Sequence, residues 1–282
     1  MAIIINDVSY IYNESTPFEH TALKDINLTI EEEKVTGIIG RVGSGKSTFI
    51  ELLNGLLIPS TGSIKIAGFD ITKGMKSSDL QKLRRKVGLV FQSPEDQFFN
   101  PTVRQEVAFA LKHYKYKNEK IYKQVLDALL MVGLDETYLE KNIFDLSAGE
   151  KRKVAIASVL VFNPKIIILD EPTVGLDYDN KRKLMLLIKK MKERYNKTII
   201  IVSHDIDMLN VIADDIIVMD EAEVLINAPK KEVFKNKEIF EKCGISLPKI
   251  VQFKDLVATK KGIKLGEYTD IKDLIKDVYR NV

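Results

Sequence analysis

The chain has 282 residues, 45% of them hydrophobic and 29% charged, which is typical of a globular protein and excludes a compositionally disordered one. Its 43 Lys and Arg and 40 Asp and Glu give a net charge of +3 spread along the sequence, so charge alone indicates neither nucleic acid nor an anionic membrane as a partner. The single cysteine, the missing signal-peptide pattern and the lack of any apolar run near the roughly 20 residues of a membrane-spanning helix favour a cytosolic chain.

The N-terminal part is predicted to consist of short strands. Segments rich in Ile and Val at residues 3–10, 23–30 and 35–39 are separated by polar turns, and the third is followed at once by glycines and a helix. A short basic helix over residues 79–86 and a buried strand over residues 87–91 come next. We expect the first strands to form an antiparallel β part.

Helical periodicity then dominates residues 103–142. One apolar face of this segment is predicted to carry Val125, Leu126, Leu129, Leu130 and Val132. We interpret the region, about residues 93–163, as a helical insertion in an α/β chain.

The second half of the chain alternates between helices and strands. Helices are predicted over residues 147–162, 180–195 and 206–213, and strands over residues 166–169, 198–202 and 215–219. This alternation predicts an α/β fold with a mainly parallel sheet that helices cover on both faces.

The character changes at about residue 229, where lysine-rich amphipathic segments begin. One apolar face is expected from Ile250, Phe253, Leu256 and Val257, and a second from Ile271, Leu274, Ile275 and Val278. We therefore divide the chain into a main domain over residues 1–228 and a small C-terminal helical extension over residues 229–282.

The segment GRVGSGKST, residues 40–48, matches G-x-x-x-x-G-K-[ST] between an apolar strand and a helix, the context that a phosphate-binding loop requires. Its glycines let backbone N–H groups converge on phosphate oxygens, and the following helix adds its positive dipole end. A glycine-rich turn that binds nothing would leave the Lys-Ser pair unexplained. Lys46 is expected to reach the β- and γ-phosphates, and the Ser47 hydroxyl to coordinate Mg²⁺. The predicted nucleotide-binding residues are Gly40, Arg41, Val42, Gly43, Ser44, Gly45, Lys46, Ser47 and Thr48.

Two acids end the apolar segment IIILDE, residues 166–171. A buried strand delivers such carboxylates to the edge where parallel sheets bind ligands. Asp170 is expected to hold Mg²⁺ and Glu171 to act as general base on an attacking water. Alone, the pair could merely cap the next loop, but the phosphate loop upstream favours the catalytic interpretation.

The segment LSAGE, residues 146–150, has two interpretations. Ser147 and Glu150 form an S-x-x-E capping box at the start of an apolar helix, which needs no further function. The capping box does not explain Ala148 and Gly149, small residues that leave the helix N-terminus able to approach an anion closely.

This segment resembles the signature motif of ABC ATPases, usually written LSGGQ, from which Ala148 and Glu150 depart. The resemblance implies an ABC-type P-loop NTPase in which Ser147, Ala148, Gly149 and Glu150 form a site for ATP held by a partner subunit. The other motifs follow in the family's order. Gln92 ends the strand VGLVFQ and matches the Q-loop glutamine that senses Mg²⁺ and the attacking water.

Three further residues match family positions. Asp177 lies in the D-loop segment GLD, which crosses the dimer interface, and His204 matches the switch histidine that contacts the γ-phosphate. Tyr12 stands where the family places an aromatic ring that stacks on adenine, although an ordinary strand-edge tyrosine is the alternative.

Three segments narrow the resemblance to ATPases of the energy-coupling factor (ECF) type, and more to the second than to the first member of the ATPase pair: residues 15–23 (STPFEHTAL), 91–99 (FQSPEDQFF) and 244–250 (GISLPKI). This implies an ATP-hydrolysing subunit that uses ATP and Mg²⁺ to power uptake of vitamins or related micronutrients, peripheral at the cytoplasmic face of the cell membrane. The implied partners are a second homologous ATPase in a heterodimer, a transmembrane coupling protein and substrate-binding membrane subunits, with no nucleic acid.

In that family a groove near the Q-loop receives helices of the membrane partner, and Pro94, Gln97, Phe98 and Phe99 are expected to line it, unless the two phenylalanines pack inward. A conventional ABC importer ATPase for metal ions or amino acids shares the catalytic motifs and is the alternative function. A DNA-maintenance ATPase would carry a long heptad insertion, and a ribosome-acting ABC protein two sets of motifs; the sequence shows neither.

Overall fold

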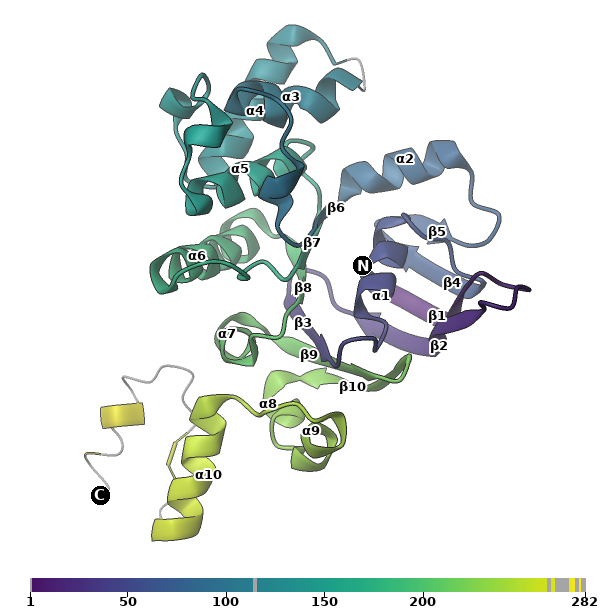
Figure 1. Cartoon of the computed structure of the whole chain (residues 1–282), viewed down its shortest axis with the longest axis vertical. Coiled ribbons are helices and arrows are strands. Elements are labelled where there is room, and N and C mark those ends of the chain that lie inside the picture. Colours follow the sequence, from purple (N-terminus) through teal and green to yellow (C-terminus); the bar gives the residue numbers. More distant parts are fainter. Residues whose placement is uncertain (1, 114–115, 263–264, 267–273, 277–278, 280–282) are drawn as a thin grey trace.

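The structure, a computed structural model, describes residues 2–113, 116–262, 265–266, 274–276 and 279. Two sheets form its centre (Figure 1). The smaller sheet is antiparallel with the order β2-β1-β4-β5. Its strands are β1 (Ile3–Tyr12), β2 (His20–Ile30), β4 (Thr61–Ile66) and β5 (Phe69–Ile71). The antiparallel N-terminal part is confirmed, whereas the hairpin of β4 and β5 was not predicted.

The larger sheet has the strand order β10-β9-β3-β8-β7-β6. All neighbours pair in parallel except β10, which runs antiparallel to β9. The strands are β3 (Val35–Gly40), β6 (Val87–Val90), β7 (Ile166–Asp170), β8 (Thr198–Val202), β9 (Asp215–Asp220) and β10 (Glu223–Pro229). The predicted α/β fold with a mainly parallel sheet is therefore confirmed.

Helix α1 (Lys46–Asn54) lies between the two sheets and buries seven of its nine residues. Phe49 is fully buried there, together with Ile5 of the small sheet and Ile38 of the large one. The helix cannot rotate or slide without breaking this packing, because interiors are close-packed.

The other face of the large sheet is covered by helices. In β7 the side chains of Ile166 and Ile168 face α1, whereas those of Ile167 and Leu169 belong to the second core beneath the helices. This two-residue alternation, apolar on both faces, is what a parallel strand buried on both sides requires. The covering helices include α5 (Ala148–Leu160), α6 (Tyr178–Tyr195) and α7 (Ile206–Ile212), and α2 (Ser77–Lys86) precedes β6.

The predicted helical insertion consists of several short elements rather than one long run. They are α3 (Val103–His113), α4 (Asn118–Met131), and the 3₁₀ helices η1 (Pro94–Gln97), η2 (Glu136–Tyr138) and η3 (Ile143–Asp145). Val125, Leu129 and Val132 are buried as predicted, but Leu130 is half exposed, which corrects its assignment to the buried face. Successive helical residues point about 100° apart, so Leu130 cannot share the face of Leu129.

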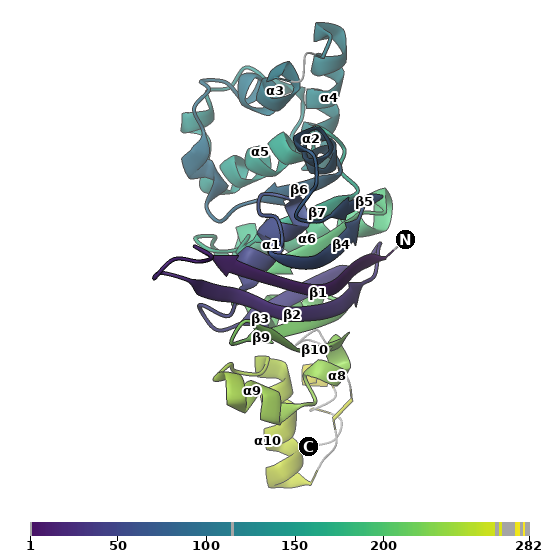
Figure 2. The ribbon, with the colours of Figure 1, turned by 90° about the vertical axis from the view of Figure 1, so that its right-hand side faces the viewer.

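The C-terminal extension begins as part of the main core. After β10 come α8 (Lys230–Val233), α9 (Lys237–Cys243) and α10 (Lys249–Lys261). Val233, Phe234, Phe240 and Cys243 join the same buried cluster as the large sheet. Figure 2 shows α8 to α10 at the opposite end of the molecule from α3 and α4.

The apolar faces expected in this extension are not buried as a set. In α10, Phe253 and Leu256 are exposed. Leu274 is buried, Ile275 is half exposed, and residues 271 and 278 lie outside the described residues. Among the described residues, no helix is long and apolar enough to cross a membrane.

A prediction follows from the position of α1. Phe49→Ala should lower the free energy of unfolding by about 3–5 kcal/mol, because it leaves a cavity between the two sheets. Phe18→Ala, in a turn where the ring is 81% exposed, is the control and should change it by less than about 0.5 kcal/mol. Urea unfolding followed by circular dichroism measures both, and equal effects of the two substitutions would contradict the packing described for α1.

Candidate nucleotide-binding and catalytic site

Four neighbouring parallel strands end at the same edge of the large sheet, and predicted catalytic residues follow these ends. β3 leads into the phosphate loop, β8 into His204, β7 into Asp170 and Glu171, and β6 into Gln92. Backbone register aligns the strand ends, since Asp170 pairs with Val202. This is the edge where parallel sheets bind ligands, and the fold brings the four sequence signals together there.

The phosphate loop curls tightly and leaves the start of α1 open. Gly45, at the N-cap of α1, has φ +97°, a left-handed conformation that a side chain disfavours, and no side chain caps the helix. A Cβ at Gly45 would lie 2.5 Å from the carbonyl oxygen of Ala22. The first N–H groups of α1 therefore remain available to an anion.

Lys46 is buried inside this loop. Its Nζ donates to the carbonyl oxygens of Gly40 at 2.8 Å and Arg41 at 2.6 Å. Burial lowers the pKa of Lys46, while the charges of Glu171 and Asp170 oppose that shift. The ammonium group thus lies between the loop and the two carboxylates.

Glu171 is buried and held in one orientation by the chain after β8. The backbone N–H of His204 donates to its Oε1 at 3.0 Å, the Ser203 hydroxyl donates to Oε2 at 3.4 Å, and the His204 Nε2 lies 3.5 Å from Oε1. Burial raises the pKa of this carboxyl, while the neighbouring His204 acts in the opposite direction. A carboxylate with a raised pKa is a stronger base than an exposed glutamate.

Asp170 shares this environment. Burial raises the pKa of its carboxyl, and the charges of Lys46 and His204 lower it. Asp170 ends β7, one residue before the general-base candidate Glu171. The two acids and the lysine therefore form one interacting charged group.

Tyr12 lies at the end of β1, beside the first turn of α1. Its hydroxyl is 3.2 Å from the Thr48 Oγ1, and its half-buried ring meets Tyr10 edge-on with ring centroids 4.8 Å apart. Thr48 is buried, whereas Ser47 in the same turn is exposed. The aromatic ring is therefore near the phosphate loop, although its predicted contact with adenine stays a prediction.

The capping box predicted for residues 147–150 is present. The Ser147 hydroxyl and backbone N–H both lie within hydrogen-bonding distance of the Glu150 carboxylate, at 2.7 and 2.9 Å. Tyr138, on η2, donates its hydroxyl to the same carboxylate at 2.6 Å. This bond from Tyr138 and those from Ser147 lower the pKa of Glu150 to about 2. No sequence signal pointed to Tyr138.

Gly149 lies close against a side chain of helix α6. A Cβ at this position would lie 2.4 Å from the Asn180 Oδ1. The Asn180 amide donates to Asp177 at 2.9 Å, and Asp177 caps α6 by accepting from the Asn180 N–H at 2.8 Å. The signature segment and the D-loop segment are thus packed together within one subunit. Asn180 was not predicted as a site residue, although its spacing from Asp177 is that of a helix cap.

The segment after β6 corrects part of the expected partner groove. Pro94 is buried and Phe98 packs against the main core, so these two residues do not form an open surface. Gln92, Gln97 and Phe99 are exposed, and the Phe99 ring packs edge-on against Phe109, which is also exposed. The inward alternative therefore holds for Phe98 and fails for Phe99.

Two side chains of the phosphate loop lie outside the loop interior. Val42 is 90% exposed, and the Arg41 guanidinium turns to the C-terminal extension. Only the backbone of Arg41 faces the loop interior, where its carbonyl accepts from Lys46.

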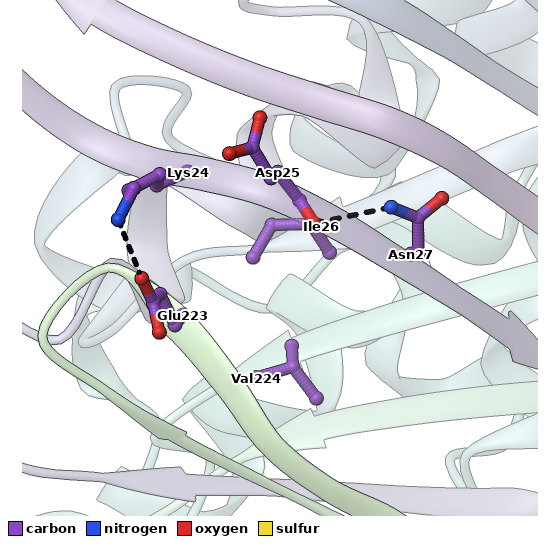
Figure 3. A pocket seen from close by; sticks show the side chains of 6 residues that line it. All are labelled: Lys24, Asp25, Ile26, Asn27, Glu223 and Val224. Atoms are coloured by element: carbon purple, nitrogen blue, oxygen red, sulfur yellow. Dashed lines mark hydrogen bonds and ion pairs between the residues drawn. The ribbon is translucent and has the colours of Figure 1, made fainter.

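A separate cavity of about 270 Å³ lies where β2 meets β10, beside the Lys24–Glu223 ion pair (Figure 3). None of its lining residues belongs to the predicted site.

Comparison with known proteins agrees with this geometry. The family described as "ABC transporter" matches residues 23–174, more than half of the chain. The chain belongs to the ABC transporter family. Its relatives include proteins with the name energy-coupling factor transporter ATP-binding protein EcfA2. The one from Caldanaerobacter subterraneus subsp. tengcongensis is 46% identical over 250 residues, 89% of this chain and 87% of the relative. The one from Clostridium perfringens is 41% identical over 288 residues, 100% of this chain and 99% of the relative.

Solved ABC structures have the same fold. The structure of cbiO1 from Clostridium perfringens, described as part of the ABC transporter complex cbiONQ, is 38% identical with a TM-score of 0.75, covering 90% of this chain and 98% of that one. The ATP-binding cassette MJ0796, in a dimeric post-hydrolysis state with ADP and Pi, is 33% identical with a TM-score of 0.69, covering 80% and 98%. These likenesses confirm the ABC ATPase fold and the assignment to the ECF type within the ABC family.

Glu150 gives a testable pH dependence. Its pKa is depressed from the ordinary 4.5 to about 2, so its bonds stabilise the fold above pH 4.5, and this contribution is lost as the pH falls toward 2. Glu150→Gln should therefore be less stable than the wild type at pH 6, and the difference should shrink between pH 4.5 and 2. Thermal unfolding at several pH values measures it.

Tyr138→Phe is the companion variant. It removes the strongest of the bonds that lower the Glu150 pKa, so the folded-state pKa should rise toward 4.5. The acid loss of stability should then begin at the same pH as in the wild type, but it should be smaller and end at a higher pH. Identical pH profiles of the wild type and both variants would show that these bonds do not stabilise the fold.

Proposed function

We propose that this chain is an ATP-hydrolysing subunit of an energy-coupling factor transporter that powers uptake of vitamins or related micronutrients. One observation carries the proposal: the phosphate loop, His204, the two acids of β7 and Gln92 follow neighbouring strands at one sheet edge. The names of the relatives support the ECF type over a conventional importer for metal ions or amino acids.

The phosphate loop binds the triphosphate of ATP in this proposal. The uncapped N–H groups of α1 and the buried Lys46 meet its negative charge, and Tyr12 stacks on the base. Because Lys46 is already desolvated, its exchange of carbonyl partners for phosphate oxygens gains charge-assisted bonds at little further cost.

The oxygen donors at the sheet edge fit Mg²⁺. Ser47 is exposed in the first turn of α1, and the carboxylate of Asp170 and the amide of Gln92 follow neighbouring strands. In the part of the chain that the structure describes, no three acidic, His or Cys side chains form a cluster that could hold a metal ion. Mg²⁺ needs no such cluster, because proteins usually bind it through one or two side chains together with substrate phosphates. Mg²⁺, when bound, would neutralise charge that develops on the phosphates. Ser47, Asp170 and Gln92 are the residues that would hold it.

Glu171 takes the proton of the attacking water. Its carboxylate is fixed by the backbone of His204, and its raised pKa makes it a better proton acceptor. His204, half exposed at the same edge, would contact the γ-phosphate, and Gln92 would orient the water.

A second subunit completes the site. Ser147, Ala148, Gly149 and Glu150 face a partner's ATP, and Asp177 crosses the interface beside them. Ser147 and Ala148 are exposed at the start of α5, as this role requires. We propose a heterodimer with a second homologous ATPase, in which two ATP molecules close the dimer and hydrolysis reopens it.

The membrane partners are a transmembrane coupling protein and the substrate-binding membrane subunits that it recruits, which place the chain at the cytoplasmic face of the membrane. The rings of Phe99 and Phe109 are exposed and pack against each other. They offer an apolar contact for the coupling protein, because contiguous exposed apolar surface is typical of interaction sites. No nucleic acid takes part.

The base assignment can be tested with Glu171→Gln in the ATPase pair. ATP turnover should fall by about 10²–10⁴-fold while ATP binding remains, because only the proton acceptor is lost. Phosphate release and nucleotide binding measure the two effects, with exposed Glu140→Gln as the control. Normal turnover by Glu171→Gln would show that another group is the base.

The phosphate loop is tested separately by Lys46→Ala. Both turnover and ATP affinity should fall, because this buried ammonium is the charge that meets the phosphates. Unchanged ATP affinity would remove Lys46 from the binding site.

The membrane contact is tested by purification of a tagged chain from its native membranes in mild detergent. Mass spectrometry should find a second ATPase, a multispanning protein and several small membrane proteins. Phe99→Asp should lose the membrane proteins but keep the second ATPase, because a charge cannot replace the apolar contact. A periplasmic-type binding protein with a dedicated permease in their place would assign the chain to a conventional importer.

A further inference from the structure

The side chain of Arg41 joins the phosphate loop to the C-terminal extension. Its Nε donates to the carbonyl oxygen of Cys243 at 2.5 Å, and its Nη2 donates to the carbonyl of Lys242. The same Nε lies 3.8 Å from the carboxylate of Asp220, at the end of β9. One forked guanidinium therefore connects the loop, the large sheet and helix α9, a geometry that suits arginine and no other side chain.

The end of α9 is shaped to present these carbonyls. Gly244 follows the helix with φ +59°, and this turn uses the carbonyls of Glu241 and Phe240 as acceptors for the N–H groups of Gly244 and Ile245. Arg41 takes the next two carbonyls. It also places a positive charge at the negative end of the helix.

Helix α9 is itself fixed by the core. Phe240 and Cys243 are buried in the cluster that includes Val233 and the strands of the large sheet. The carbonyls that Arg41 contacts therefore have a defined position as long as the extension stays packed.

Arg41 also contacts the catalytic lysine through its main chain. Its carbonyl oxygen accepts from the Lys46 Nζ at 2.6 Å, while its side chain reaches α9. One residue thus contacts both helix α9 and Lys46.

We propose that Arg41 is a positioning residue through which the C-terminal extension and ATP binding are energetically coupled. The proposal rests on the proposed role of the phosphate loop in ATP binding. When α9 is packed against Arg41, the loop holds Lys46 in the position that receives the triphosphate. Coupling between two sites is reciprocal, so ATP must in turn favour the packed state of α9.

Cys243 reports on this packing. It is the only cysteine of the chain, it is buried, and its own carbonyl accepts from Arg41. A thiol reagent reaches a buried cysteine only when the surrounding segment opens, so its reaction rate measures local opening of α9. Dithionitrobenzoate, with release of thionitrobenzoate followed by absorbance, provides this rate for the purified full-length chain.

In the wild type, saturating ATP should slow the labelling of Cys243. Arg41→Ala should speed labelling without ATP, abolish the effect of ATP on it, and weaken ATP binding by about fivefold, the lower end of usual couplings because the contact is half exposed. Circular dichroism confirms that the variants fold.

Two further variants separate this role from charge alone. Arg41→Lys keeps the charge but cannot reach both carbonyls, so it should behave like Arg41→Ala in labelling. Arg104→Ala removes an arginine of matching exposure, 47% against 49%, that pairs with Glu140 in the helical insertion, and should leave ATP affinity and labelling unchanged.

The outcomes are distinct. Tight ATP binding by the wild type with no change in Cys243 labelling would overturn the coupling, as would wild-type behaviour of Arg41→Ala or Arg41→Lys. A wild-type chain that bound no ATP would instead refute the proposed nucleotide site and the coupling that rests on it.

Discussion

The burial of α1 between the two sheets is the constraint on which the rest of the structure depends. Its apolar residues, with Phe49 at the centre, fill the space between the antiparallel and the parallel sheet. Because packing fixes the helix, its first turn always faces the same edge of the large sheet. An anion site built from backbone N–H groups needs this rigidity, since loop flexibility alone would spread those groups in different directions.

Burial also sets the chemistry of the polar groups. Burial lowers the pKa of Lys46 and raises the pKa of Glu171, while nearby opposite charges counteract both shifts. A bound phosphate would change the charges around both side chains and would therefore shift both pKa values. If they were exposed to water, the same side chains would keep nearly ordinary pKa values.

The sequence predicted the parts of the fold that have strong local signals. The apolar β7, the phosphate loop and the S-x-x-E box each follow a pattern of adjacent residues, and the structure contains all three elements. The hairpin of β4 and β5 escaped prediction because its strands are short and β4 contains Gly62. Leu130 was misplaced because it adjoins the buried Leu129 in sequence but lies about 100° away around the helix.

Contacts between distant segments could not be predicted from spacing. The bond of Tyr138 to Glu150 and the packing of Asn180 on Gly149 join different elements. Arg41 shows the limit most clearly. The loop pattern placed Arg41 among the nucleotide-binding residues, whereas its side chain contacts α9, about 200 residues away in sequence. Only the folded topology reveals such a partner.

Glu171 combines its buried carboxylate with an unfavourable backbone. Its φ of +45° lies in the left-handed region, where a non-glycine residue costs on the order of 1 kcal/mol or more. Glycine at this position would relieve the strain, but it would also remove the carboxylate and the hydrogen bonds that it accepts from His204 and Ser203. The strained backbone and the proposed base therefore come together at this position, because the substitution that removes the strain also removes the base.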